Sequence, residues 1–352
     1  MGVGHVAFYA GEIFSNNVKP IQFFRHFSVI VTMKKWHFLW LSLLYFCSIP
    51  RLYAQWEEPP GQYWAVRSHY NPSLAGETEA INTSALYRYS WNGIKNAPRQ
   101  LYLTANMPFE FFGMRHGAGV TLYNESIGDL HNSLLAFQYS WKKRIGTNYL
   151  NVGLQAGVYD LHFDAESKTF FEEEPHNRKT VKVTPVDKQV IDLNAGISWT
   201  GETLFVSLST LHITQPRFYT HPDFNMQSDS AQSVITRSLN LMTGYNITHF
   251  YPLEIQPLLW VLTDLNTTQV QATLRMEYNK KFSGGASWRK DDGYHFFVGN
   301  VFHGAEWGYT YGLHTMGVGK SSRGSHEVYV RYAFSVDYFK PKRFPHKSIR
   351  LL

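Results

Sequence analysis

The sequence has little of three things: cysteine, charge and long apolar runs. Its single cysteine, Cys47, lies in a leader-like segment, so the rest of the chain can build neither a disulfide framework nor a thiolate metal site. Charged residues make up 17% of the chain, below the ~25% usual in soluble proteins. The apolar run at 36–49 is too short for a helical membrane span, and no later segment has helical periodicity over a useful length. These features exclude a helical membrane protein and a disulfide-rich secreted domain.

The positive charge of the chain is modest and partly terminal. Lysine and arginine number 33 against 27 acidic residues, which gives a formal net charge of +6. Part of the excess lies at Lys34, Lys35 and Arg51 and in the tail at 340–350. No basic helix or known binding module accompanies the charge, so no nucleic-acid partner is predicted.

Aromatic residues and an alternating pattern are abundant. Phe, Trp and Tyr make up 16% of the chain, and Tyr and Trp favour boundaries between apolar and wet surroundings. Residues 150–158 are apolar at every second position and polar or glycine in between, and 269–279 repeat this with a more polar second face. Such alternation fits a strand with one face in hydrocarbon, although a soluble β-sandwich alternates as well.

Fourteen strands are predicted, an even number as antiparallel closure of a single-chain bacterial barrel requires. Short turns at 142–146, 200–202 and 290–293 carry the Gly and Asp of hairpins, whereas the connections 164–187 and 216–235 are long. Short turns at one end and long loops at the other are typical of outer-membrane barrels. The predicted strands are 81–91, 100–108, 115–123, 131–142, 148–163, 188–199, 203–213, 236–249, 253–262, 267–278, 282–290, 294–302, 306–315 and 325–334.

The N-terminal region has the parts of a secretory signal peptide. Lys34 and Lys35 precede the apolar run, and Ala54 offers a small residue for cleavage. An uncleaved anchor helix is the alternative, which the shortness of the run disfavours, and no cysteine follows the cleavage site to carry a lipid anchor. We expect a mis-annotated upstream extension (1–32), a signal peptide (33–54), an irregular lead-in or plug (55–80), an outer-membrane β-barrel (81–334) and a basic tail (335–352).

Together these features predict an all-β fold, a transmembrane antiparallel β-barrel of about 14 strands with a short irregular N-terminal segment. A bilayer admits only helices or closed barrels as spanning structures, and long helices are absent from the pattern. Inward positions such as Arg275 and Glu277, or Glu327 and Arg331, carry both charge signs. A selective pore more often shows a ring of one sign, so the pattern favours a closed scaffold over a channel.

No catalytic, cofactor or metal site is expected. The 16 histidines are scattered without a ligand spacing on one face. Ser325, His326 and Glu327 are consecutive, but adjacent strand residues face opposite sides, so the three cannot form a nucleophile–base–acid chain with one another. Single glycines inside strands, such as Gly117, are interpreted as relief of crowding in a curved sheet.

The assembled motifs resemble the PorP/SprF family of type IX secretion system outer-membrane proteins of Bacteroidota. The likeness begins with residues 62–63 and 69–76, continues through 87–91, and closes with 309–313 and 324–328. Gly312 stands where the family commonly has Asp, and the chain continues past Phe334. The residues that carry the resemblance, in structural or interaction roles, are Asn71, Pro72, Gly76, Tyr87, Arg88, Trp91, Gly324, Ser325, His326 and Glu327.

The resemblance implies a non-catalytic outer-membrane component that aids export or surface attachment of secreted proteins such as adhesins, including those of gliding motility. Its expected partners are periplasmic and lipoprotein subunits of the secretion system, secreted cargo and outer-membrane lipid. The loops 164–187 and 216–235 are candidates for the cargo side, and 55–80 with the tail for the periplasmic side. Two rivals stay open: a porin or transporter of hydrophobic compounds, and an outer-membrane hydrolase with a Ser-His-acid set from separate strands.

Overall fold

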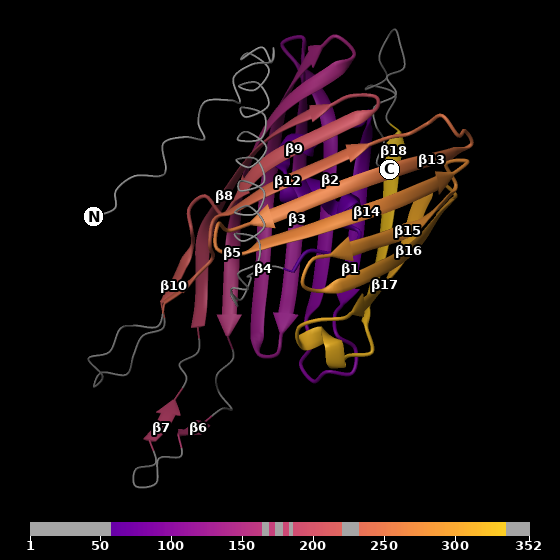
Figure 1. Cartoon of the computed structure of the whole chain (residues 1–352). Coiled ribbons are helices and arrows are strands. Elements are labelled where there is room, and N and C mark those ends of the chain that lie inside the picture. The colour runs from indigo at the N-terminus through magenta and orange to yellow at the C-terminus, as the bar shows by residue number, and fades with distance from the viewer. Residues whose placement is uncertain (1–57, 164–168, 173–178, 183–185, 220–231, 336–352) are drawn as a thin grey trace, which may run out of the picture. The chain divides into compact units, whose positions relative to one another are not determined.

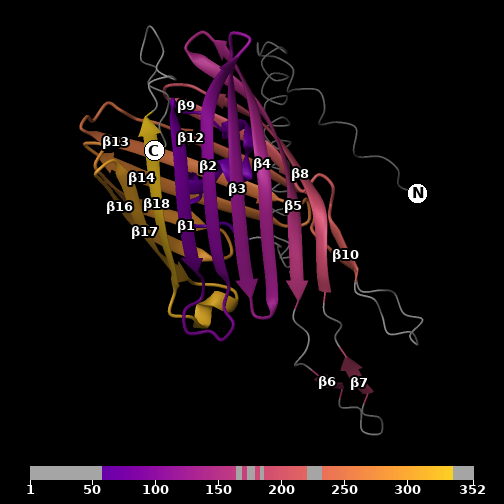
Figure 2. The same ribbon diagram turned by 180° about the vertical axis from the view of Figure 1, so that it is seen from behind.

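The structure, a computed structural model, describes residues 58–163, 169–172, 179–182, 186–219 and 232–335. Fourteen antiparallel strands form a closed barrel in which β1 pairs with β18 (Figure 1, Figure 2). The barrel strands are β1 (Ala80–Tyr89), β2 (Arg99–Phe111), β3 (Met114–Ile127), β4 (Leu130–Ile145), β5 (Asn148–Phe163), β8 (Val186–Thr200), β9 (Leu204–Leu211), β12 (Ser238–Tyr245), β13 (Leu253–Thr263), β14 (Thr268–Tyr278), β15 (Phe282–Arg289), β16 (Gly293–Phe302), β17 (Ala305–His314) and β18 (Ser325–Ser335).

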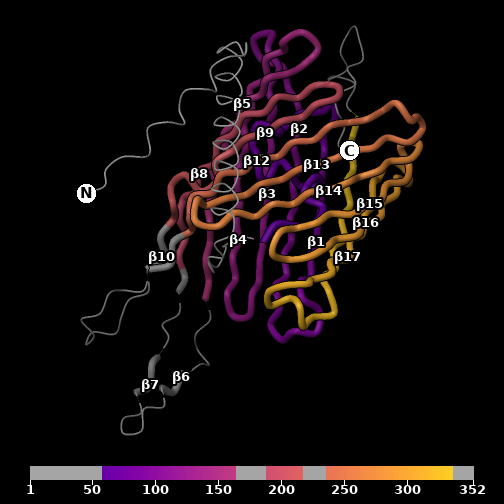
Figure 3. The backbone as a smooth tube through the Cα atoms, in the orientation of Figure 1, coloured from indigo at the N-terminus to yellow at the C-terminus, as the bar shows by residue number. Residues whose placement is uncertain are grey.

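Each barrel strand pairs with the barrel strands before and after it in sequence, so the chain winds around the barrel as a meander (Figure 3). Closure leaves no unpaired edge. Two small hairpins interrupt the meander, β6 (Thr169–Glu172) with β7 (Lys179–Lys182) and β10 (Arg217–Tyr219) with β11 (Gln232–Val234). The short helical turns are η1 (Tyr63–Val66), α2 (Arg67–Tyr70), η2 (Pro72–Leu74) and η3 (Val318–Ser321). None of the helices in the described ranges has the length and apolarity that crossing a membrane demands.

The strands place apolar side chains outward and polar ones inward. On β4 and β8, Phe137 and Ile191 expose 66% and 67% of their surface, whereas the inward Asn151 of β5 exposes 1%. A soluble sandwich buries its apolar face, whereas here the apolar face points outward. This distribution favours the membrane barrel over the soluble β-sandwich, the two folds that the alternation left open. The predicted transmembrane barrel of about 14 strands is confirmed.

The two ends of the barrel differ in their connections. One end, here the turn end, has the connections 112–113, 146–147, 201–203, 246–252, 279–281 and 303–304. The other, the loop end, has 90–98, 128–129, 164–185, 212–237, 264–267, 290–292 and 315–324. Both long connections predicted from the sequence belong to the loop end, with parts of them outside the described residues. Long loops project outward in outer-membrane barrels, so we expect the loop end to face the medium.

All fourteen predicted strands correspond to observed ones, with differences at their ends. The largest extension is in β3, predicted to end at residue 123 and observed to Ile127. Asn124 and Glu125 pair there with Ser133 and Asn132 of β4. Residues on both faces of β3 are polar here, so the apolar–polar alternation that predicts a membrane strand is lost before the strand ends.

The barrel lumen is filled by residues 58–79, here called the lumen segment. This segment includes η1, α2 and η2 and runs ahead of β1. Its apolar side chains form one buried cluster with inward-facing aromatic residues of the wall, among them Tyr102, Trp260 and Phe297. The core of this protein therefore lies inside the barrel, where a porin would hold water.

Candidate functional site

At the loop end, the lumen segment is anchored by the carboxylate of Glu327. This inward side chain of β18 accepts hydrogen bonds from the backbone N–H groups of Gly61 (2.7 Å) and Gln62 (3.2 Å). Arg88 of the adjacent strand β1 lies 3.3 Å from the same carboxylate. Both side chains are buried, so the pair is shielded from solvent and from salt.

A second acid extends this anchor toward solvent. The Glu58 carboxylate forms ion pairs with Arg88 and with Arg289 of β15, the latter at 3.2 Å. Both guanidinium groups also donate to the Pro59 carbonyl, at 2.7 and 2.8 Å. Here the loop-end anchor means Glu58, Arg88, Arg289 and Glu327, two acids and two bases that join strands β1, β15 and β18 to the lumen segment.

Aromatic packing holds the middle of the lumen segment. Trp260 of β13 contacts Tyr63 and Tyr70, with ring centroids 4.8 and 5.1 Å apart. The Trp64 ring meets Phe297 of β16 edge to face at 4.9 Å. The Tyr70 hydroxyl lies 3.1 Å from the Tyr102 hydroxyl of β2. These contacts fill the centre of the barrel with side chains from opposite walls.

Near the turn end, the lumen segment packs against glycines of the wall. Asn71 donates its amide to the Ser207 hydroxyl of β9 at 2.6 Å. A Cβ atom added to Gly196 of β8 would lie 2.0 Å from the Asn71 side-chain oxygen, and one on Gly153 of β5 would lie 2.2 Å from the backbone N of Ser73. Gly117 of β3 likewise has no room for a side chain. These glycines admit the close approach of the lumen segment, through its backbone at Gly153 and Gly117 and through the Asn71 side chain at Gly196, a more specific role than the relief of crowding expected from the sequence.

Gly153→Ala is therefore expected to destabilise the barrel by about 1–3 kcal/mol, because the added methyl overpacks against backbone that cannot rotate away. Gly284→Ala is the matched control, since a Cβ at this strand glycine meets only the Phe297 carbonyl, at 3.4 Å. Denaturant unfolding of the purified barrels measures both. Equal stability of the two variants would contradict the close approach at Gly153.

Beside the loop-end anchor, a Ser-His-Asp arrangement joins three connections. His314, at the end of β17, contacts the Asp292 carboxylate through Nδ1 and lies 2.5 Å from the Ser325 hydroxyl through Nε2. The backbone N–H of Trp91 donates a hydrogen bond to that hydroxyl, at 3.0 Å. Burial would raise the pKa of Asp292, but the hydrogen bond from His314 and the charge of Arg289 outweigh it and hold that pKa well below its usual range. The carboxylate is therefore ionised and fixes the imidazole.

The surroundings of Ser325 are tightly packed. Its side chain is buried, and its oxygen already accepts the Trp91 N–H. Gly319 of η3 packs over the group so closely that a Cβ there would lie 2.8 Å from His314 Cγ and 2.6 Å from Trp91 Nε1. These contacts tie the loop-end connections 90–98 and 290–292 to the start of β18, and the serine clamp here means Asp292, His314, Ser325 and the Trp91 backbone.

The residues that carry the family resemblance fall into three sets. The residues brought together inside the loop end are Arg88, Trp91, Gly324, Ser325 and Glu327. The Gly324 carbonyl also accepts a hydrogen bond from the backbone N–H of Asn92, at 2.7 Å. Asn71, Pro72 and Gly76 lie farther along the lumen segment, toward the turn end.

Two of the motif residues point away from the lumen. Tyr87 is exposed on the outer wall, and His326 bonds the Tyr309 hydroxyl on that same face at 2.8 Å. Glu327 pairs with Arg88, whereas the inward Arg331 pairs with Glu306. Sequence patterns gave no signal for Glu58, Arg289, Asp292 and His314, because their ion pairs across the loop end join residues that are distant in the chain.

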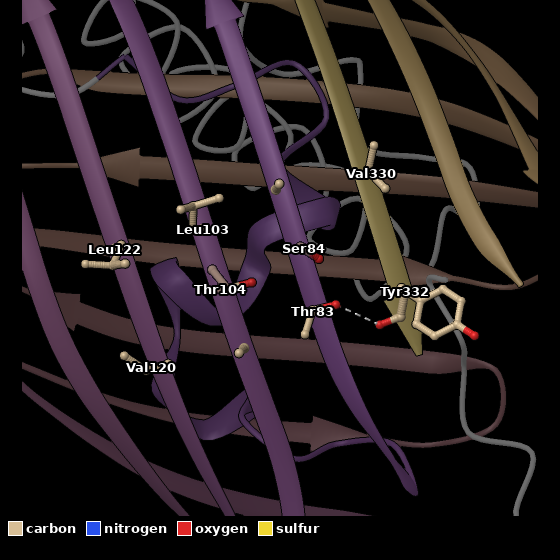
Figure 4. Close-up of a pocket in the computed structure, with 10 residues that line it drawn as sticks. Thr83, Ser84, Leu103, Thr104, Val120, Leu122, Val330 and Tyr332 are labelled. Carbon is tan, nitrogen blue, oxygen red and sulfur yellow. Dashed lines mark hydrogen bonds between the residues drawn. The ribbon is translucent and has the colours of Figure 1, made fainter. Parts of the chain in front are cut away.

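The outer wall has a groove of about 340 Å³ across β1, β2, β3 and β18 (Figure 4). Leu103, Leu122 and Val330 line it, and the Thr83 hydroxyl donates to the Tyr332 carbonyl at its edge, at 3.3 Å. These residues belong to the apolar outer face, so the groove is part of the lipid-contacting surface. Within the described parts of the chain, no group of three or more His, Cys, Asp or Glu residues could hold a metal ion.

Solved structures with a similar fold share little sequence with this chain. They include the β domain of the Bordetella autotransporter BrkA (13% identity, 72% of this chain, 99% of that chain, TM-score 0.33). Another is the Escherichia coli outer membrane phospholipase A (10% identity, 76% of this chain, 99% of that chain, TM-score 0.33). A third is a Pseudomonas aeruginosa FadL homologue (9% identity, 77% of this chain, 94% of that chain, TM-score 0.42). A search of curated protein sequences finds no match.

A family profile covers nearly the whole barrel and the lumen segment. Residues 54–332 match the family described as type IX secretion system membrane protein PorP/SprF. The match includes every residue of the loop-end anchor and of the serine clamp. The chain belongs to the PorP/SprF family of type IX secretion system membrane proteins.

Proposed function

We propose that this outer-membrane barrel is a non-catalytic scaffold of the type IX secretion system that supports export or surface attachment of secreted proteins such as adhesins. The observation that carries the proposal is the filled lumen: the lumen segment is held by buried ion pairs at one end and by close backbone packing near the other. A barrel that offers no passage acts through its two ends and its outer wall. The host is a member of the Bacteroidota, and the leader is cleaved after Ala54.

The loop end is the proposed cargo side, with the connections 164–185 and 212–237. The turn end, with the tail at 335–352, is the proposed side for periplasmic and lipoprotein subunits. The sequence predicted the periplasmic side for 55–80 as well, and we limit that proposal to the last residues of the segment, at the turn end. Tyr63, Trp64 and Tyr70 are buried in the lumen, and Glu58 lies at the loop end.

Site-specific photo-crosslinking in intact cells tests the proposal. A crosslinking residue at the exposed Val318 of the loop end should capture a secreted protein, and one at Phe112 of the turn end should capture secretion-system subunits. Phe137, on the outer wall, is the control and should capture lipid only. Recovery of porins alone from both ends would overturn the assignment. Gliding and the display of adhesins on the cell surface are measured in the same strains.

The porin alternative is tested by conductance in planar bilayers. The intact protein should show no steady open state, since its lumen is packed with side chains. Stable conductance at low voltage, with the barrel still heat-modifiable on gels, would favour the transporter.

Ser325→Ala is expected to destabilise the loop end by about 1–3 kcal/mol, because the partly buried backbone N–H of Trp91 loses its acceptor. The intact protein should not react with a fluorophosphonate probe of serine hydrolases, before or after this substitution. Labelling that disappears in the Ser325→Ala variant would instead establish a hydrolase and refute the scaffold as stated.

A further inference from the structure

The lumen segment has a direction, and its first residues lie at the loop end. Glu58 bonds Arg88 and Arg289, which are close to the loop-end termini of β1 and β15. Gly61 bonds Glu327, the third residue of β18, a strand that begins at the loop end. The Glu58 side chain keeps 24% of its surface exposed, so this part of the chain reaches solvent.

The last residues of the segment lie at the turn end. The Gly76 N–H donates to Asn106 at 3.1 Å, and Arg115 donates to the carbonyls of Glu77 (3.3 Å) and Thr78 (2.9 Å). β1 then starts at Ala80 and returns to the loop end. The lumen segment and β1 therefore run in opposite directions through the same barrel.

From this path we infer that the lumen segment begins at the outer face of the membrane, with Glu58 among the surface loops, and runs inward to the turn end. Tyr63, Trp64 and Tyr70 are buried along this path, between the loop-end anchor and the turn end. The opposite end, Ser335 of β18, lies at the turn end. The two ends of the barrel domain then face opposite sides of the membrane.

Single-cysteine labelling tests the inference in a Cys47→Ser background, which has no other cysteine. The variants are Trp56→Cys, Leu265→Cys at the loop end and Phe112→Cys at the turn end; the last two side chains are 81% and 84% exposed. With a membrane-impermeant maleimide on intact cells, Trp56→Cys and Leu265→Cys should label at least tenfold more than Phe112→Cys. After permeabilisation of the outer membrane, all three should label equally.

Other outcomes identify which step is wrong. Labelling of Trp56→Cys only after permeabilisation, with Leu265→Cys labelled on intact cells, would overturn the outward path. Labelling of Phe112→Cys alone on intact cells would show an inverted barrel and overturn the outward presentation too. A Trp56→Cys variant that labels only when denatured would show a buried end and would also refute it. Heat-modifiable migration of each variant confirms that the labelled protein is folded.

Discussion

Deletion of residues 58–79 is expected to abolish the folded barrel, not to convert it into an open pore. The lumen segment buries five large apolar side chains, those of Tyr63, Trp64, Val66, Tyr70 and Leu74. At roughly 1.5–3 kcal/mol for each, their loss is comparable with the ~5–15 kcal/mol that stabilises a typical protein. Wall residues such as Trp260 and Phe297 would also face water. Heat-modifiable migration after extraction from membranes measures the outcome.

Two companion variants make the deletion interpretable. Trp64→Ala should weaken the barrel by about 3–5 kcal/mol without abolishing it, as truncation of a buried aromatic side chain does. Phe112→Ala, at the exposed turn, should have no measurable effect. A deletion variant that is stable, heat-modifiable and steadily conducting would show that the lumen segment is a removable plug.

Glu327→Ala is expected to destabilise the barrel by about 3–5 kcal/mol, because it removes the buried partner of a buried charge. The substitution removes the acceptor of the Gly61 and Gln62 N–H groups and leaves Arg88 with Glu58 as its remaining acid. Denaturant unfolding in detergent micelles gives the change in free energy. The first residues of the lumen segment should also become sensitive to protease.

A double substitution that removes both charges separates the contribution of the ion pair to stability from that of the hydrogen bonds. Arg88→Met with Glu327→Leu removes both charges, so it should recover part of the stability lost in Glu327→Ala alone. Glu110→Ala, at an exposed acid of β2, is the control and should change stability by less than about 0.5 kcal/mol. If Glu327→Ala behaves like Glu110→Ala, the loop-end anchor does not hold the lumen segment.

The barrel could be predicted from the sequence because each strand meets its two environments locally. Alternation at 150–158 reports lipid on one side and lumen on the other, and it locates β5 without knowledge of the rest of the chain. The signal weakens where the environment changes, as in β3 beyond Tyr123, where the wall leaves the apolar band. Strand ends were therefore less predictable than the strands themselves.

The candidate site could not be predicted because its contacts join residues that are far apart in sequence. Gly61 and Glu327 are separated by 266 residues, and the sequence around either residue does not indicate the other as its partner. Proline and glycine predict an irregular lead-in or plug at 55–80, but they do not indicate which wall residues it would contact. The serine clamp was missed for the same reason: the sequence draws attention to His326, whereas Ser325 bonds His314 from the neighbouring strand.

The lumen segment also braces the barrel mechanically. Tyr70 bonds β2 through its hydroxyl and both β9 and β12 through its carbonyl, so one residue ties walls that lie across the barrel from each other. A hollow cylinder flattens when it is pulled sideways, whereas a cylinder with internal cross-ties passes the force to its far wall. A tensile load applied to the surface loops is thus shared by the whole circumference.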